Sequence, residues 1–155
     1  GEYLEYPPEK IKPPICRVLG QIKDSRAVPS LIEQLEDYHA EVRAAACEGL
    51  GLIGASQAVP QLIEKLSDRD EKVRAAACQA LGQIGNPQAV PMLIKKLGDR
   101  SLEVRINACW ALGQIGDPSA LASLDQLKHT DSDCWGAAEK AIERIRAKQA
   151  TRNGL

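Results

Sequence analysis

The 155-residue sequence contains no phenylalanine, and aromatic residues make up only 3% of it. A hydrophobic core must therefore be built from Leu, Ile, Val and Ala, and the small residues among these allow close helix packing. No apolar run approaches the roughly 20 residues of a membrane-spanning helix, and no signal-peptide pattern is visible at the start. The length predicts one domain, residues 1–155, with a substantial core.

An excess of either charge is also lacking, because the formal net charge is −1. This balance does not favour a nucleic acid or an anionic membrane as the partner. Histidine occurs only twice, at His39 and His129, and neither is followed by glutamate. The sequence has no phosphate-cradling glycine loop, and no second histidine near either one to serve as the base of a nucleophilic triad. These absences predict a chain without catalytic residues and without a metal site.

The sequence does contain an internal repeat with a period of 31 residues. Residues 58–88 read AVPQLIEKLSDRDEKVRAAACQALGQIGNPQ, and residues 27–57 and 89–119 repeat this pattern. Self-similarity at a fixed period of this size is typical of repeat architectures. An amphipathic repeat cannot bury its apolar side alone, so stacked copies are expected to form a solenoid.

Each repeat is predicted to form two helices. Pro60 suits the first turn of the first helix, because its missing N–H would have no partner there. The polar stretch 67–70 is the expected turn, and a second helix begins near Glu71. Gly85 followed by Pro87 is expected to end that helix. The apolar positions that define the two helical stripes are Leu62, Ile63, Leu66, Val73, Ala76, Ala77, Ala80, Leu81 and Ile84.

The two ends of the chain depart from the repeat. Residues 1–26 are interpreted as an N-terminal arm and a partial repeat, whose helix is expected to begin near Pro13 or Pro14. Two interpretations fit Gly1–Glu5. They form the last turn of an earlier helix, if the chain was cut from a longer repeat array, or they form a natural N-terminal arm that covers the first exposed helix. Residues 120–150 form a degenerate capping repeat that is one residue short, and residues 151–155 form a tail. The sum is nine helices, one alone and four pairs.

The pattern AVPxLIxxLxDxxxxVRxxACxALGxIGxP resembles the HEAT-like repeats of the phycobilisome-lyase type. The resemblance implies an all-α fold, a right-handed α-α superhelix in which the second helices line the concave face. It does not determine a function, because such repeats occur both in phycobilin lyase subunits and in plain interaction modules. The HEAT-repeat iron hydroxylases use paired His-Glu motifs, and this sequence has none.

Aspartate and arginine recur at a fixed spacing of six residues in each repeat. Such regular charges could form a binding stripe, but the family resemblance favours a hydrogen-bonded structural ladder between repeats. Bonds that involve ionised groups belong to the stronger class of hydrogen bonds. The residues concerned are Asp37, Arg43, Asp68, Arg74, Asp99 and Arg105.

Four of the five cysteines, namely Cys16, Cys47, Cys78 and Cys109, occupy one position of the repeat. Packed helices lie about 8–10 Å apart, which is too far for a disulfide or for ligands of one zinc ion. Free thiols packed between helices are therefore expected, and they fit a reducing compartment. Cys134 lies outside this pattern and could be exposed.

Positions that vary between repeats gather on one side of the second helices. Because residues are 100° apart around a helix, these positions lie opposite the apolar stripe. We name them the concave-face strip: Arg17, Glu48, Leu52, Gln79, Gln83, Ile106, Trp110 and Gln114. Trp110 beside Ile106 has the character of an interface anchor. Alternatively, Trp110 packs against the irregular last repeat, on Trp135.

The sequence thus predicts a non-catalytic, cytoplasmic scaffold that binds a partner protein or peptide through its concave face, without cofactor or membrane. A second hypothesis, which rests on the family resemblance, is a lyase subunit or chaperone for attaching bilins to phycobiliproteins. A bilin is anionic and would need cations in the groove, and Arg17 is the only cation of the strip. Nucleic-acid binding is a weaker alternative, because the sequence has no basic stripe outside the ladder.

Overall fold

The computed structural model describes residues 7–154, which form nine α-helices joined by turns and five short 3-10 helices, with no strand in that range. The predicted all-α fold with nine helices is therefore confirmed, while Gly1–Glu5 lie outside the described residues. None of these helices is long and apolar enough to cross a membrane. The helices are α1 (Pro8–Ile22), α2 (Val28–Gln34), α3 (Ala40–Ile53), α4 (Val59–Lys65), α5 (Glu71–Ile84), α6 (Val90–Lys96), α7 (Leu102–Ile115), α8 (Leu121–Thr130) and α9 (Trp135–Arg152).

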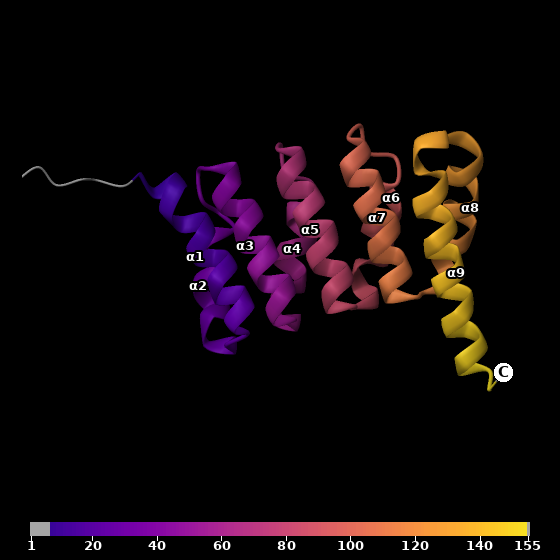
Figure 1. Ribbon diagram of the computed structural model, residues 1–155, viewed down its shortest axis with the longest axis horizontal. Coiled ribbons are helices and arrows are strands. Elements are labelled where there is room, and N and C mark those ends of the chain that lie inside the picture. The colour runs from indigo at the N-terminus through magenta and orange to yellow at the C-terminus, as the bar shows by residue number, and fades with distance from the viewer. Residues whose placement is uncertain (1–6, 155) are drawn as a thin grey trace, which may run out of the picture.

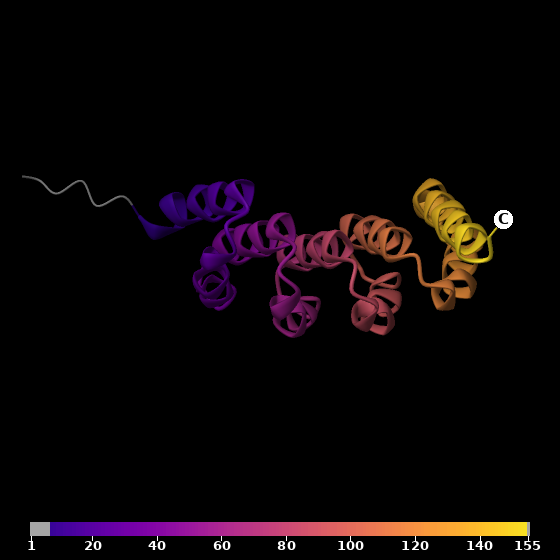
Figure 2. The ribbon, with the colours of Figure 1, turned by 90° about the horizontal axis from the view of Figure 1, so that it is seen from below.

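The helices form two layers. Figures 1 and 2 show the long helices α1, α3, α5, α7 and α9 side by side in one layer, with the short helices α2, α4, α6 and α8 in the other. The layer of long helices is bowed, and in Figure 2 α1 and α9 lie higher than α5, on the side away from the short helices. The long helices therefore line the concave face of the solenoid.

Local sequence sets where these helices begin and end. Each seven-residue helix carries proline in its first turn, where a missing N–H costs no hydrogen bond. The long helices α3, α5 and α7 are followed directly by Gly54, Gly85 and Gly116, which have φ values of 75° or 76°. This left-handed conformation is strained for residues with a Cβ atom. The three complete repeats thus share the same helix-start and helix-end residues.

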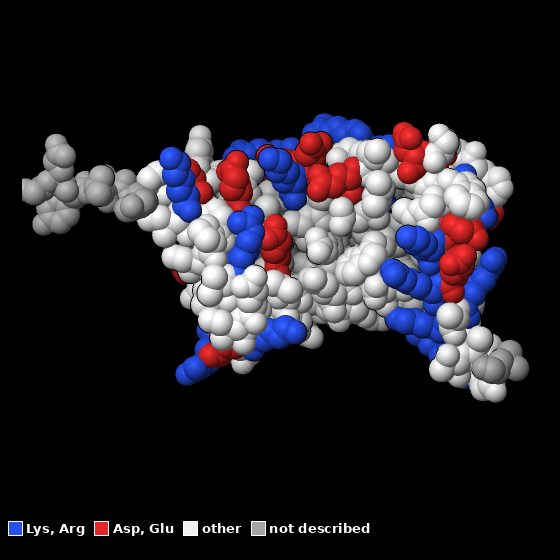
Figure 3. All heavy atoms as spheres, in the orientation of Figure 1, with Lys and Arg blue, Asp and Glu red and all other residues white. Residues whose placement is uncertain are grey.

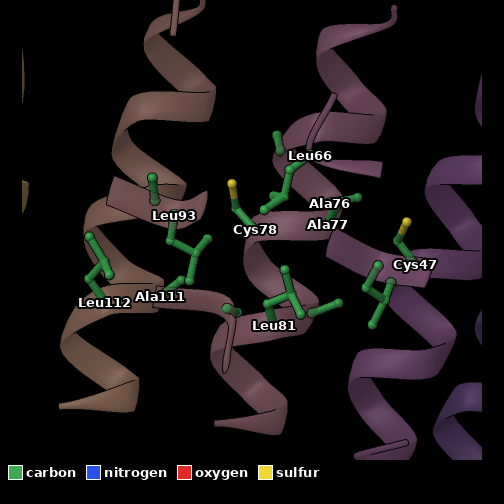
Figure 4. Packing of buried hydrophobic residues seen from close by; sticks show 14 of the residues in the cluster. Cys47, Leu66, Ala76, Ala77, Cys78, Leu81, Leu93, Ala111 and Leu112 are labelled. Carbon is green, nitrogen blue, oxygen red and sulfur yellow. The ribbon is translucent and has the colours of Figure 1, made fainter. Parts of the chain in front are cut away.

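The long helices approach one another closely because small residues meet at each contact. A Cβ atom on Gly20 would lie 2.6 Å from the Cα atom of Gly49, and one on Gly82 would lie 2.7 Å from the Cα atom of Ala111. Figure 4 shows Ala111 between α5 and α7, with Leu81 and Leu112 nearby. We call these contacts the small-residue ladder: Gly20–Gly49, Gly51–Ala80, Gly82–Ala111 and Gly113–Ala141.

A second ladder, of charged side chains, links the turns at one end of the long helices. The guanidinium of Arg43 donates to both carboxylate oxygens of Asp68, at 2.9 and 3.0 Å, and also to the carbonyl oxygens of Asp37 and Tyr38. Asp68 in turn accepts a hydrogen bond from the backbone N–H of Asp70. Each cation therefore bonds the aspartate of the next repeat. The rungs are Lys12–Asp37, Arg43–Asp68, Arg74–Asp99 and Arg105–Asp131.

The expected start of the first helix is wrong. Helix α1 begins at Pro8 and continues through Pro13 and Pro14, although each internal proline removes one backbone hydrogen bond. Packing of α1 along α3 and the 2.8 Å bond from Lys12 to Asp37 hold its first turns in place. Lys12 thus stands in the ladder where the full repeats have arginine.

One side of α1 is apolar and uncovered. Ile15, Val18 and Ile22 have exposed fractions of 51%, 50% and 64%. The equivalent residues Ala46 and Gly49 of α3 are buried, because α1 covers them. In the part of the chain that the structure describes, α1 therefore has no neighbour on this side.

We predict that Arg74→Ala will lower the free energy of unfolding by about 3–5 kcal/mol, because it leaves Asp99 buried without its cation. Arg74 is 4% exposed, and it binds Asp99 through two hydrogen bonds. Urea denaturation followed by circular dichroism measures the change. The control is Arg146→Ala, an exposed position of α9 that forms no ion pair among residues 7–154. Equal stabilities of these two variants would contradict the structural role of the ladder.

We also predict that the protein loses stability as the pH falls from about 5 to about 2. Burial alone would raise the pKa of Asp37, but hydrogen bonds from Lys12 and His39 lower it to about 2. The pKa values of Asp68 and Asp99 are lowered in the same way by their arginines, against the effect of burial. Because the folded state binds protons less readily than the unfolded state, protonation favours unfolding.

The measurement is the urea midpoint at several pH values between 7 and 2. Asp37→Asn removes the carboxylate with the largest of these three shifts. This variant is expected to be less stable at pH 7 and to lose less further stability on acidification. A midpoint that does not change with pH in the wild type would contradict the prediction.

Candidate functional site

The concave-face strip lies along the long helices, and its members differ in how accessible they are. Gln79, Gln83 and Ile106 are exposed, while Leu52 and Gln114 are half-buried. Figure 3 shows this face, with a mostly uncharged centre and with both basic and acidic side chains over α9. Of these five strip residues, three are therefore open to solvent and two are accessible only in part.

Arg17 and Glu48 neutralise each other on this surface. Nε of Arg17 lies 2.7 Å from a carboxylate oxygen of Glu48, and both side chains are partly exposed. The one cation that the sequence placed in the strip therefore already has a carboxylate partner. An exposed pair of this kind contributes about 0–1 kcal/mol to stability.

The residues that occupy the repeat position of Ile106 in the preceding long helices are buried. They are Pro13, Ala44 and Ala75, whereas Ile106 is 38% exposed. Pro13, Ala44, Ala75 and Ile106 occupy the same repeat position, which differs between repeats and on that ground was expected to be free surface throughout; this expectation is wrong for Pro13, Ala44 and Ala75.

Several strip residues lie over a glycine of the preceding long helix. Leu52 reaches Gly20, Gln83 reaches Gly51, and the ring of Trp110 lies over Gly82. The glycines of the small-residue ladder therefore also hold these side chains close to the concave surface. Trp110 is half-buried by this contact.

Trp110 does not stack on Trp135. Among residues 7–154 the only aromatic ring pair is Tyr38 with His39. The ring of Trp135 instead has Nζ of Lys128 at 5.4 Å from its centre, a distance typical of a cation–π contact. Trp110 borders the last repeat across an open pocket of about 420 Å³.

Residues of α9 also belong to this surface, and the sequence interpretation missed them. Gly136, Lys140 and Arg144 line the pocket together with Ile106 and Trp110. The signal was present, because Lys140 and Arg144 follow Trp110 and Gln114 by 30 residues, the spacing of the shortened last repeat. Reading α9 only as a polar cap concealed them.

The cysteines form no reactive or metal-binding site in the described residues. All five are free and buried, including Cys134, whose expected exposure is wrong. Burial raises the pKa of Cys47, Cys78 and Cys109 to about 12. No group of three His, Cys, Asp or Glu side chains in residues 7–154 is arranged to hold a metal ion.

Comparison with known proteins agrees with this architecture. A model of HEAT repeats matches residues 2–66 and 59–143. The chain belongs to the HEAT repeat family. A search of curated proteins found no match.

Among solved structures, the chain is similar to a chain of the complex of CpcE and CpcF of phycocyanin lyase from Nostoc sp. PCC7120, with 30% identity and a TM-score of 0.78. The similarity covers 92% of this chain but only 62% of that one. An engineered protein matches with 24% identity and a TM-score of 0.63, over 93% of this chain and 78% of the other. Computationally designed armadillo repeat proteins for modular peptide recognition match with 21% identity and a TM-score of 0.61, over 92% and 79%. The last two similarities concern the fold alone.

We predict that the native protein reacts slowly with the thiol reagent 5,5′-dithiobis(2-nitrobenzoic acid) at pH 8. A thiol with a pKa near 12 is ionised in only about one molecule in ten thousand at that pH, and burial blocks the reagent as well. Less than one thiol should react within minutes, and all five should react in guanidinium chloride. The control Ser119→Cys places one exposed thiol in the short 3-10 helix Pro118–Ala120. Rapid reaction of the native wild type would contradict the burial of the cysteines.

Proposed function

We propose that the chain is a non-catalytic scaffold that binds a partner protein or peptide segment in the reducing cytoplasm through the concave-face strip. The observation that carries this proposal is the pairing of half-buried Trp110 with exposed Ile106 beside an open pocket. Tryptophan is among the residues most enriched at binding hot spots, which gather in well-packed pockets.

The fold supports the same function. The long helices are fixed by two ladders, so the concave surface is already ordered before a partner arrives. Binding to an ordered surface avoids much of the conformational entropy that flexible binding sites lose. The five free cysteines agree with a reducing compartment.

A second candidate function is that of a phycobilin lyase subunit or chaperone. It is supported by the 30% identity to a chain of the CpcE–CpcF complex of phycocyanin lyase. Bilins carry carboxylates, and Lys140 and Arg144 supply the cations that the strip was expected to lack. The chain spans only 62% of that relative. Catalytic activity is part of this second candidate and not of the scaffold function.

The test is site-specific photo-cross-linking in cells of the source organism. Benzoylphenylalanine replaces Gln79 on the concave face or, as the control, exposed Gln126 on the short helix α8. We expect a defined protein to be captured from Gln79 and not from Gln126. A second substitution, Trp110→Ala, should reduce capture from Gln79 at least fivefold, because it removes the largest apolar contact of the surface.

Circular dichroism establishes whether the Trp110→Ala variant is folded. Capture of phycobiliprotein subunits, with visible bilin absorbance in the purified complex, would favour the lyase candidate. Equal capture from Gln79 and Gln126, or none from Gln79, would contradict the concave face as the binding surface.

A further inference from the structure

The pocket beside Trp110 lies between α7 and α9 on the concave face. We name it the α7–α9 pocket; it is lined by Ile106, Trp110, Gly136, Ala137, Lys140, Ala141 and Arg144. Its volume of about 420 Å³ is at the lower end of the usual range for ligand pockets, about 300–1,000 Å³. Such a volume suits one or two side chains of a peptide.

The pocket exists because the last repeat has a glycine where its neighbour has a large side chain. Gly136 follows Ile106 by the 30-residue spacing of that repeat, and a Cβ atom on Gly136 would meet no atom within 4 Å. Ala141 meanwhile packs onto Gly113, so α9 stays close to α7 below the pocket. The space is therefore open at Gly136 and closed at Ala141.

The two walls of the pocket differ in chemistry. On α7, the ring of Trp110 and the side chain of Ile106 form an apolar wall. On α9, Lys140 and Arg144 are exposed, one helical turn apart, and neither has a carboxylate within 4.0 Å among residues 7–154. Like charges at this spacing repel each other. An anion between them would relieve that repulsion.

Two other cations of α9, Lys148 and Arg146, have a partner or face elsewhere. Nζ of Lys148 donates to the backbone carbonyl oxygens of Gln114 and Ile115, at the negative end of the α7 dipole. Arg146 is exposed on the opposite side of α9, since it is 200° away from Arg144 around the helix. The unpartnered positive charge at the pocket therefore comes from Lys140 and Arg144.

We propose that the α7–α9 pocket binds an acidic peptide segment through one aromatic side chain with carboxylates on either side of it. The aromatic ring packs on Trp110 and Ile106, and the carboxylates pair with Lys140 and Arg144. This inference rests on the proposed scaffold function and names the chemistry of its partner.

The probe is a fluorescein-labelled peptide, Gly-Ser-Glu-Glu-Phe-Glu-Glu-Ser, and fluorescence anisotropy measures its binding. We expect saturable binding that weakens between 50 and 300 mM NaCl, since partly exposed charge pairs are screened by salt. Two matched peptides, one with every Glu replaced by Gln and one with Phe replaced by Ser, should each bind more weakly.

Three protein variants locate the binding. Lys140→Gln with Arg144→Gln should weaken binding roughly three- to thirtyfold, whereas Arg146→Gln with Arg152→Gln, which changes the net charge equally, should leave it within about twofold. Gly136→Leu should weaken binding at least tenfold by filling the pocket. Its urea midpoint should be equal to or above that of the wild type, because leucine favours a helix more than glycine does.

The proposal is overturned if the wild type does not bind the acidic peptide, if it binds the glutamine peptide equally well, or if the stably folded Gly136→Leu variant binds as the wild type does. The cross-linking experiment separates this result from a failure of the scaffold function. Capture from Gln79 together with any of these results would leave the concave face as a binding surface and reject the acidic chemistry. If capture from Gln79 and peptide binding both fail, the scaffold function is rejected as well.

Discussion

The close approach of neighbouring long helices is the constraint on which the rest of this structure depends. At each contact a glycine or alanine of one helix meets a glycine or alanine of the next, as at Gly20 with Gly49 and Gly82 with Ala111. Backbones this close leave no room for a side chain at these glycines, and they bring the apolar stripes of successive repeats into one continuous core. The same glycines give Leu52, Gln83 and Trp110 a place to lie on the concave face. Packing and surface shape thus have one cause.

The charged ladder acts at one end of these helices and sets the register of the repeats. Arg43 and Arg74 are buried, and each spans from the turn of its own repeat to the aspartate of the next. Removing charges from water offsets much of their mutual attraction, so such pairs are weak evidence for a large gain in stability. Their two parallel hydrogen bonds are directional, and a repeat shifted along its neighbour would lose both of them. The ladder therefore fixes alignment, while the small-residue ladder fixes distance.

Much of the architecture could be predicted from the sequence because the same helix-start and helix-end signals occur in all three full repeats. The period, the proline at the start of the short helices and Gly85 at the end of α5 all correspond to observed helix boundaries. The ends were harder, because only one copy of each exists for comparison. Two prolines suggested a late start for α1, but tertiary contacts of Lys12 and Cys16 keep the helix intact from Pro8. Local propensity was overruled there by packing.

The candidate site was predicted only in part for a related physical reason. Whether a side chain is exposed depends on which side chains pack against it in the folded protein. The repeat pattern alone does not identify the side chains that cover Ala75 or Cys134, and both residues are buried. The last repeat shows most clearly that a site can be missed for this reason. Its polar residues suit contact with water, but two of them, Lys140 and Arg144, also line the same pocket as Trp110. This repeat departs from the pattern of the other three, and the departure includes a glycine at Gly136 with two cations beside it. The repeat that departs most from the pattern is thus the one with the most distinctive surface.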